Sequence, residues 1–143
     1  MTDQDLRQLL QDAKVIAVVG LSANPDRPSN QVAWYLLHQG YRLFGVNPAC
    51  PEPEVHGIPM LASLDEVREP IDIVDVFRRP EHTPEVARAA VAAGARALWL
   101  QLGIASDEAR AIATEAGLTY VEDYCLKVEH ARLLGRQGRE AAG

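Results

Sequence analysis

With 143 residues, 48% of them hydrophobic, the chain has enough length and apolar content for one domain with one core. Its formal net charge of −6, without any Lys/Arg-rich run, offers no attractive field to a nucleic-acid duplex or an anionic membrane surface. We therefore expect a single domain over residues 1–143 that binds neither nucleic acid nor membranes.

The N-terminal segment predicts a short helix and no signal peptide. Thr2 and Asp5 have the spacing of a capping box, and apolar residues recur at helical intervals over residues 3–13. The segment lacks the basic and apolar regions of a signal peptide, and no apolar run in the chain approaches the roughly 20 residues of a membrane-spanning helix. We expect a cytoplasmic protein.

A strand–helix–strand unit follows this first helix. The run Val15–Val19 is continuously apolar and stops at Gly20, which is typical of a strand buried on both faces. A helix is predicted over residues 29–37, with its first residue, a serine, as the N-cap. Gly40 provides the left-handed stop, and residues 41–46 form the second strand.

The middle of the chain predicts a long loop, a short helix and a third strand. Residues 47–60 are rich in proline and glycine and are assigned to the loop, and Ser63 is placed to cap a helix that ends at Arg68. The third strand is Ile71–Phe77. Within it, Asp75 is a carboxylate in an apolar run, so we expect donors from a neighbouring loop or helix end to satisfy it.

The second half alternates helices and strands, with caps and stops of the expected residue types. Thr83 precedes Pro84 at a helix start, Gly94 follows a helix end, and Ser106 is placed as another N-cap. In chain order we predict a helix from Thr83 to Gly94, a strand over residues 97–100, a helix over residues 106–116, a strand over residues 118–121 and a last helix of about ten residues from about Leu126 before a frayed tail.

Five short apolar strands that alternate with helices predict an α/β fold. Right-handed crossovers then favour a doubly wound five-stranded parallel sheet of order 3-2-1-4-5, with helices on both faces, a Rossmann-like fold. In such sheets a ligand binds beyond the carboxyl ends of the strands, where the strand order reverses. The residues that directly follow each strand are therefore the candidates for a site.

The loop after the first strand is a candidate phosphate site. Gly20 allows a sharp turn, Ser22 and Asn24 flank Ala23 with small polar side chains, and Arg27 offers a forked donor just before a helix N-terminus. The alternative is that the loop is an ordinary turn with Arg27 in solvent. An acidic net charge is compatible with a small phosphorylated ligand, because such a site is local.

A dinucleotide-dependent oxidoreductase is disfavoured by the same region. The loop carries one glycine instead of G-x-G-x-x-G, and the second strand ends at Phe44–Pro48 without the acid that holds a ribose diol. A P-loop is absent as well.

Polar residues also follow the third and fourth strands. Arg78 and Arg79 either bind an anionic ligand or lie in solvent facing Glu81 and Glu85. Gln101 either contacts a ligand amide or satisfies a backbone group.

Cysteine and histidine give no motif of their own. Cys50 and Cys125 lie far apart outside any CxxC pattern, and the four histidines show no ligand-like pairing, so we expect free thiols and no metal site. Cys125 is either a reactive thiolate or a small buried apolar residue. Glu129 and His130 are adjacent on one helix and point roughly 100° apart, so they do not form an acid–base pair by position alone.

Five segments at the five strand ends together resemble the stand-alone coenzyme A-binding proteins, a family related to the N-terminal domain of the succinyl-CoA synthetase α-subunit. The resemblance runs from about Ala13 to about His130, and the segments are GLSANPDRPS, GVNP, DVFRRPE, LWLQLG and EDYCLKVEH. It implies that coenzyme A (CoA) or a short acyl-CoA is the ligand. The first loop and following helix would hold the diphosphate, the segment after the second strand would border the adenosine, and the third and fourth strand ends would border the pantetheine arm. The residues implied in CoA binding are Gly20, Ser22, Ala23, Asn24, Arg27, Asn47, Pro48, Phe77, Arg78, Gln101 and Gly103.

The chain departs from the synthetase in what it lacks. The synthetase carries its phosphorylated histidine in a second domain and its nucleotide-activating machinery in another subunit, and this chain ends before either. We therefore expect a CoA-binding module without a complete catalytic constellation. Two alternatives are a small enzyme that handles acyl-CoA or the CoA thiol through Cys125, which lies where the synthetase domain also carries a cysteine, and a non-catalytic partner subunit of an acyl-CoA synthetase-type enzyme. A homodimer or a complex with another protein is compatible with each.

Overall fold

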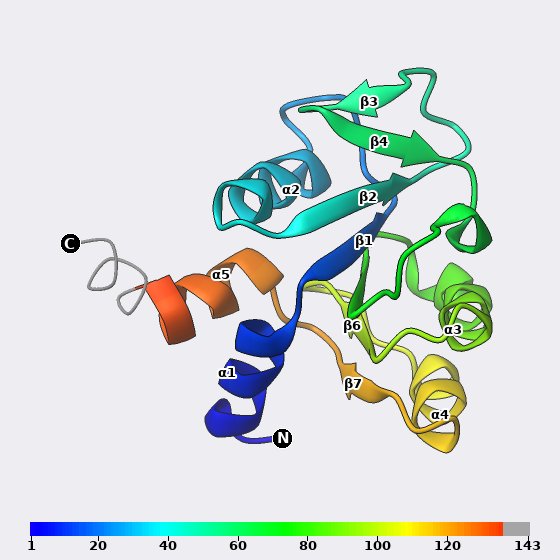
Figure 1. Ribbon diagram of the computed structural model, residues 1–143. Helices are drawn as coiled ribbons and strands as arrows, with labels where there is room; N and C mark the ends of the chain where they lie inside the picture. The colour runs from blue at the N-terminus through cyan, green and yellow to red at the C-terminus, as the bar shows by residue number, and fades with distance from the viewer. Residues whose placement is uncertain (136–143) are drawn as a thin grey trace.

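A computed structural model describes residues 1–135, and in it one sheet is covered by helices on both faces (Figure 1). The strands are β1 (Val15–Val19), β2 (Arg42–Val46), β3 (Glu54–Val55), β4 (Ile58–Leu61), β5 (Ile73–Val76), β6 (Ala97–Leu100) and β7 (Thr119–Val121). The helices are α1 (Asp3–Asp12), α2 (Pro28–His38), α3 (Thr83–Ala92), α4 (Asp107–Glu115) and α5 (Leu126–His130), with two 3-10 turns, η1 (Leu64–Glu66) and η2 (Pro80–His82). This confirms the α/β class.

The number and order of strands differ from the prediction. The sheet has seven strands in the order β3-β4-β2-β1-β5-β6-β7, and every neighbouring pair is parallel except β3–β4. The predicted five-stranded order 3-2-1-4-5 is wrong because it placed the strand Ile71–Phe77 beyond the second strand. That strand is β5, which pairs with β1. The position beyond β2 belongs to β4, from the segment 47–60 that was assigned to loop.

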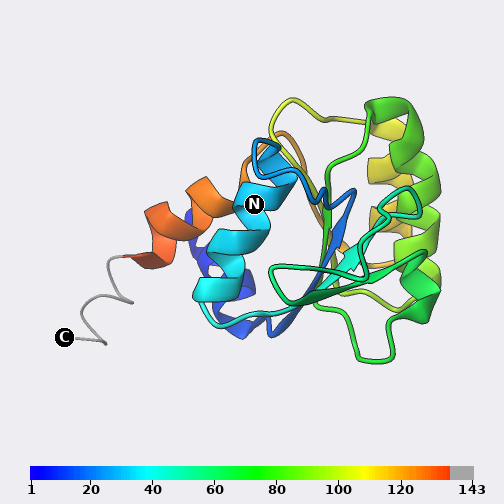
Figure 2. The same cartoon turned by 90° about the horizontal axis from the view of Figure 1, so that it is seen from above.

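The two faces of the sheet carry separate apolar clusters. Ile16, Val18 and Trp99 belong to a cluster that includes residues of α1, α2 and α5. Ala17 and Leu98, which alternate with them along β1 and β6, belong to the cluster that includes residues of α3 and α4. Figure 2 shows α2 and α5 on one side of the sheet and α3 and α4 on the other. The chain therefore leaves β1 toward one face and β5 toward the opposite face.

The predicted helix caps were correct in part. Ser106 caps α4, since its Oγ accepts a backbone N–H three residues later at 3.1 Å. Ser29 and Thr83 lie inside their helices and do not cap them, because each helix begins earlier than predicted. Ser29 Oγ instead accepts the N–H of Ser22 at 3.0 Å, and Thr83 Oγ1 donates to the Pro80 carbonyl at 2.7 Å.

Two further predicted helices, over residues 63–68 and from about Leu126, differ in length or type from the prediction. The helix predicted over residues 63–68 is reduced to η1, and Ser63 precedes it without capping it. The last predicted helix is α5, continued by a π-helical turn over Ala131–Gly135. The tail that was predicted to fray lies outside the described residues. Within residues 1–135, no helix has the length and apolar content needed to cross a membrane.

Asp75 is buried at the centre of the sheet without the donors that we expected. It pairs in register with Val18 of β1 and Trp99 of β6, is 0% exposed, and neither of its carboxylate oxygens has a hydrogen-bond partner among residues 1–135. The expectation that a loop or helix end would satisfy it is wrong. Burial raises the pKa of Asp75 well above the ordinary value, because the sheet interior disfavours the charged form.

The stability of the protein should therefore depend on pH through Asp75. The raised pKa means that the folded chain retains a proton that the unfolded chain loses above about pH 4, so stability is full below that pH and falls as pH rises toward the folded-state pKa. Asp75→Asn replaces the titratable carboxyl group by an amide that does not titrate, so the variant lacks this pH dependence. Urea titrations at several pH values give the unfolding equilibrium constants of the wild type and the variant. The ratio of the wild-type constant to the variant constant should rise by up to about tenfold per pH unit over that window. A difference that stays constant from pH 4 to pH 8 would contradict this.

Gly20 ends β1 in a conformation that brings two strand ends together. Its φ is +92°, its N–H donates to the Val46 carbonyl at 2.8 Å, and a Cβ atom built on it would lie 2.5 Å from the Phe77 carbonyl oxygen. Gly40 has a similar φ of +95°, but its Cβ would meet nothing within 4 Å.

These two glycines form a matched pair of variants. Gly40→Ala should cost only the left-handed strain, about 1–2 kcal/mol of unfolding free energy. Gly20→Ala should cost more, by roughly another 1–3 kcal/mol, because the added methyl group also displaces the Phe77 backbone. Urea unfolding of both variants measures the difference. Equal losses would show that the close approach to Phe77 has no energetic weight.

Candidate functional site

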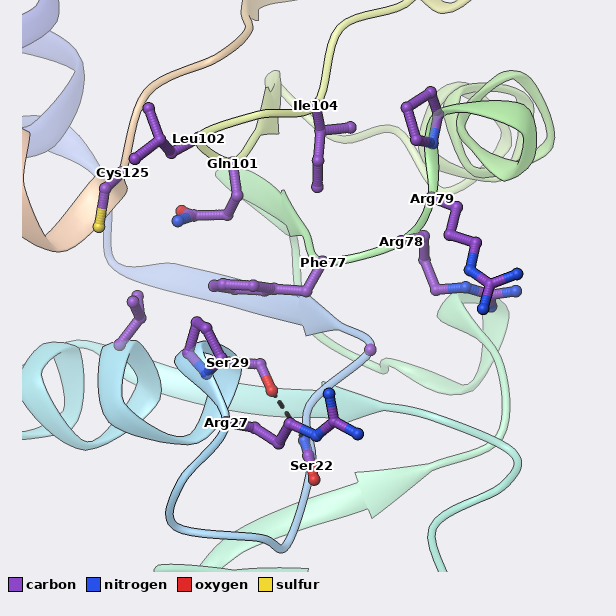
Figure 3. A pocket seen from close by; sticks show the side chains of 14 residues that line it. Ser22, Arg27, Ser29, Phe77, Arg78, Arg79, Gln101, Leu102, Ile104 and Cys125 are labelled. Atoms are coloured by element: carbon purple, nitrogen blue, oxygen red, sulfur yellow. Dashed lines mark hydrogen bonds between the residues drawn. The ribbon is translucent and has the colours of Figure 1, made fainter.

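A cavity of about 700 Å³ lies beyond the carboxyl ends of β1, β5 and β6 (Figure 3). The loops that follow these three strands, the first turns of α2 and the residue before α5 form its walls. It is lined by Gly20, Ser22, Arg27, Pro28, Ser29, Val32, Phe77, Arg78, Arg79, Pro80, Gln101, Leu102, Ile104 and Cys125. Its size is in the usual range for a small-molecule site, about 300–1,000 Å³.

The cavity brings together part of the residue set named from the sequence. The predicted residues that line it are Gly20, Ser22, Arg27, Phe77, Arg78 and Gln101. The predicted residues outside its lining are Ala23, Asn24, Asn47, Pro48 and Gly103.

Several of the residues outside the cavity shape the loops around it. Asn24 Oδ1 accepts the N–H of residue 26 at 2.9 Å. Asn47 Nδ2 donates to the Leu21 carbonyl at 3.0 Å and so holds the first loop to the end of β2. The Gly103 N–H donates to Asp123 Oδ1 at 2.7 Å. Ala23 lines a different hollow, beside His56.

The cavity also contains residues that the sequence did not assign to a site. Val32 and Ser29 lie three residues apart on α2, so they share a helix face, and this spacing is the signal that could have found them. Arg79 and Cys125 had been considered as candidates but not assigned. Leu102 and Ile104 follow β6 and carry no local signal that separates them from other loop residues.

Three arginines gather at one part of the cavity without carboxylate partners. Arg27 comes from the loop before α2, and Arg78 and Arg79 come from the end of β5. In the part of the chain that the structure describes, none of the three forms an ion pair, and the expected alternative of Arg78 and Arg79 facing Glu81 and Glu85 is not seen as a contact. Unpaired guanidinium groups near a helix N-terminus can bind phosphate oxygens in forked geometry.

Several other exposed arginines among the described residues are paired with carboxylates. Arg88 and Glu108 form an ion pair at 3.2 Å, and Arg110 lies 2.9 Å from a carboxylate of Glu122. The three cavity arginines are therefore a local concentration of uncompensated positive charge in a chain whose net charge is −6.

The remainder of the cavity is mostly apolar and ends at a thiol. Val32, Phe77 and Ile104 supply apolar surface, and Figure 3 shows Cys125 at the end opposite Arg78 and Arg79. Guanidinium groups at one end, an apolar middle and a sulfur at the other end together suit an elongated ligand with an anionic end.

Gln101 lies along this path, and its side chain is 4% exposed. Its Oε1 accepts the N–H of Leu126 at 3.0 Å, which is the backbone contact foreseen as one of its two roles. This hydrogen bond occupies the amide oxygen of Gln101. The NH₂ group of the same amide has no hydrogen-bond partner among the described residues.

Glu129 and His130 do not form an acid–base pair. Glu129 accepts from Arg132 at 2.6 Å, whereas His130 Nδ1 lies 2.8 Å from the Tyr35 hydroxyl. Burial lowers the pKa of His130. Neither residue lines the cavity.

Comparison with known proteins gives a family for the chain. Residues 14–131 match the family described as CoA binding domain. The uncharacterized protein YneT of Bacillus subtilis is 42% identical over 127 residues, which are 89% of this chain and 93% of YneT.

Several solved structures resemble the chain in fold, and some of them also in sequence. A structure from Thermus thermophilus has a TM-score of 0.89 and 44% identity, and covers 93% of this chain and 99% of its own. A hypothetical protein from Pyrococcus horikoshii has a TM-score of 0.90 and 40% identity, with 94% of both chains covered. A dinucleotide-forming acetyl-coenzyme A synthetase of Ca. Korarchaeum cryptofilum shares only the fold, at 20% identity and a TM-score of 0.68 over 79% of this chain and 26% of the synthetase. The family match over most of its length shows that this chain belongs to the CoA-binding domain family.

Proposed function

We propose that this protein binds coenzyme A in the cavity at the ends of β1, β5 and β6. The observation that carries the proposal is the division of one cavity into a cationic end and an apolar end, in a chain of the CoA-binding domain family. CoA has the same division, with phosphates on its nucleotide part and a pantetheine arm that ends in a thiol.

The phosphates are assigned to the side of the cavity formed by the first loop. Arg27 stands before the N-terminus of α2, an 11-residue helix whose dipole favours an anion there. Arg78 and Arg79 approach from the end of β5, and Figure 3 shows the three guanidinium groups on the same side of Phe77. Three unpaired cations suit a ligand that carries several phosphate charges.

The pantetheine arm is assigned to the path between Phe77 and α2. Val32 and Phe77 would contact its methylene groups, and the Gln101 NH₂ group is available to an amide carbonyl or a sulfur. Binding of this kind needs no general acid or base. The described residues that line the cavity include neither a carboxylate nor a histidine.

Calorimetric titration tests the ligand. CoA should bind in the micromolar range or tighter, whereas NAD and ATP should bind much more weakly because neither carries an arm that fills the apolar path. Acetyl-CoA, titrated in parallel, separates free CoA from a short acyl-CoA as the preferred form. If NAD bound best, or if none of the four ligands bound, the proposal would be wrong.

Arginine variants test where the phosphates lie. Arg27→Ala and Arg78→Ala should each weaken CoA binding roughly tenfold, the loss expected for one hydrogen bond to a charged group. Arg68→Ala is the matched control, because Arg68 is exposed and precedes Glu69, which pairs with Arg42 at the amino end of β2. The same loss in all three variants would indicate a general charge effect and would remove the support for this site.

A further inference from the structure

Cys125 is held in place at the cavity by two side chains of the β6 segment. The Trp99 Nε1–H donates to the Tyr124 carbonyl at 2.8 Å, and the Leu126 N–H donates to Gln101 Oε1 at 3.0 Å. Trp99 is 0% exposed and Gln101 is 4% exposed, so both hydrogen bonds start from fixed side chains in the interior. The residues immediately before and after Cys125 are thus tied to the sheet.

The thiol of Cys125 is free and faces the cavity. It is half-buried, takes part in no disulfide, and in Figure 3 its sulfur points into the space between Gln101 and α2. Cys50 is equally half-buried and free, but it follows β2, lies near the Glu52 carbonyl, and is not part of the cavity lining.

A donor that no described residue engages stands beside this thiol. The hydrogen bond from Leu126 fixes the orientation of the Gln101 amide, so that its NH₂ group is directed into the cavity, and Figure 3 shows the amide extended toward Cys125. Because this NH₂ group faces the cavity and donates to no described residue, it is free to donate to an acceptor on a ligand. A ligand atom that is electron-rich, such as a carbonyl oxygen or a thiolate sulfur, is the expected partner.

We propose that Cys125 forms a mixed disulfide with coenzyme A by exchange with a CoA disulfide, and this inference rests on the proposed CoA binding. The Cys125 thiolate attacks one sulfur of the CoA disulfide, so the Cys125 Sγ–S bond forms as the S–S bond of the CoA disulfide breaks. The second CoA leaves as a thiolate and takes up the proton that Cys125 released to solvent. Cys125 is oxidised, the departing CoA is reduced, and a thiol reductant reverses the step.

The three parts of the cavity have separate tasks in this exchange. The arginines hold the phosphates of one CoA half, the apolar path extends its pantetheine arm, and Gln101 donates to the sulfur that carries negative charge during exchange. The protein would then hold CoA in oxidised form and return it when reductant is present.

Intact-mass spectrometry after incubation with CoA disulfide tests the step. The wild type should gain the mass of one CoA at Cys125, and dithiothreitol should remove it. Cys50→Ser should gain the same adduct, whereas Cys125→Ser should gain none. Glutathione disulfide should react with Cys125 at least about tenfold more slowly, because it lacks the phosphates that the arginines bind. Equal labelling of both cysteines, or equal rates with both disulfides, would overturn the inference.

A second variant tests Gln101 as a positioning residue. Gln101→Glu keeps an oxygen acceptor for the Leu126 N–H and replaces the NH₂ donor by an oxygen. Adduct formation with CoA disulfide should slow roughly tenfold in a variant that urea titration shows to be folded under the assay conditions. An unchanged rate would remove Gln101 from the exchange.

Calorimetry of Cys125→Ser with CoA separates this inference from the proposed function. If Cys125→Ser binds CoA and the wild type forms no adduct, the exchange is wrong and CoA binding stands. If Cys125→Ser does not bind CoA and the wild type forms no adduct, both the CoA binding and the disulfide exchange are wrong.

Discussion

Where β1 and β5 end, the backbone of Gly20 lies so close to Phe77 that a Cβ atom would come within 2.5 Å of the Phe77 carbonyl oxygen. The position of the site follows from this contact. From Gly20 the chain turns to α2 on one face of the sheet, and from Phe77 it turns to α3 on the other. Two parallel strands whose connections diverge leave an opening at their carboxyl ends, and the cavity occupies that opening. Only a residue without a side chain allows the strand ends to meet there.

The prediction from the sequence succeeded where one element carried its own signal. Val15–Val19 and Ala97–Leu100 were placed to the residue, because each is a continuous apolar run that is buried on both faces. It failed for β4, whose four residues include Pro59 and follow Gly57, and which pairs with β2 through only two residues. Proline and glycine are the usual signals of a loop, so a strand this short was invisible, and its omission misplaced β5 in the sheet order.

The site residues, too, could be predicted only where a local sequence signal marked them. Arg27 and Arg78 could be named because they directly follow predicted strands or precede a predicted helix, so their place depends on local signals. Val32 and Cys125 enter the cavity through packing between elements far apart in sequence, and α2 contacts α5 only in the folded chain. Asp75 is a further case, because a carboxylate in an apolar run suggested partners, whereas the sheet leaves both of its oxygens without one. Such outcomes depend on tertiary packing, which periodicity and capping rules do not contain.

An acidic net charge is compatible with a cationic cavity, because salt screens the distant acidic side chains but not the arginines that line the cavity. The chain has six more acidic than basic side chains. Elsewhere on the surface, several arginines form ion pairs with some of these acidic side chains, as Arg88 does with Glu108. Beyond a Debye length of about 8 Å at physiological salt, the remaining acidic groups are screened. At the cavity, Arg27, Arg78 and Arg79 form no ion pair within the described residues, and the cavity lining contains no carboxylate. A ligand of the proposed kind would therefore bind with its anionic end toward these arginines and its opposite end beside Gln101 and Cys125.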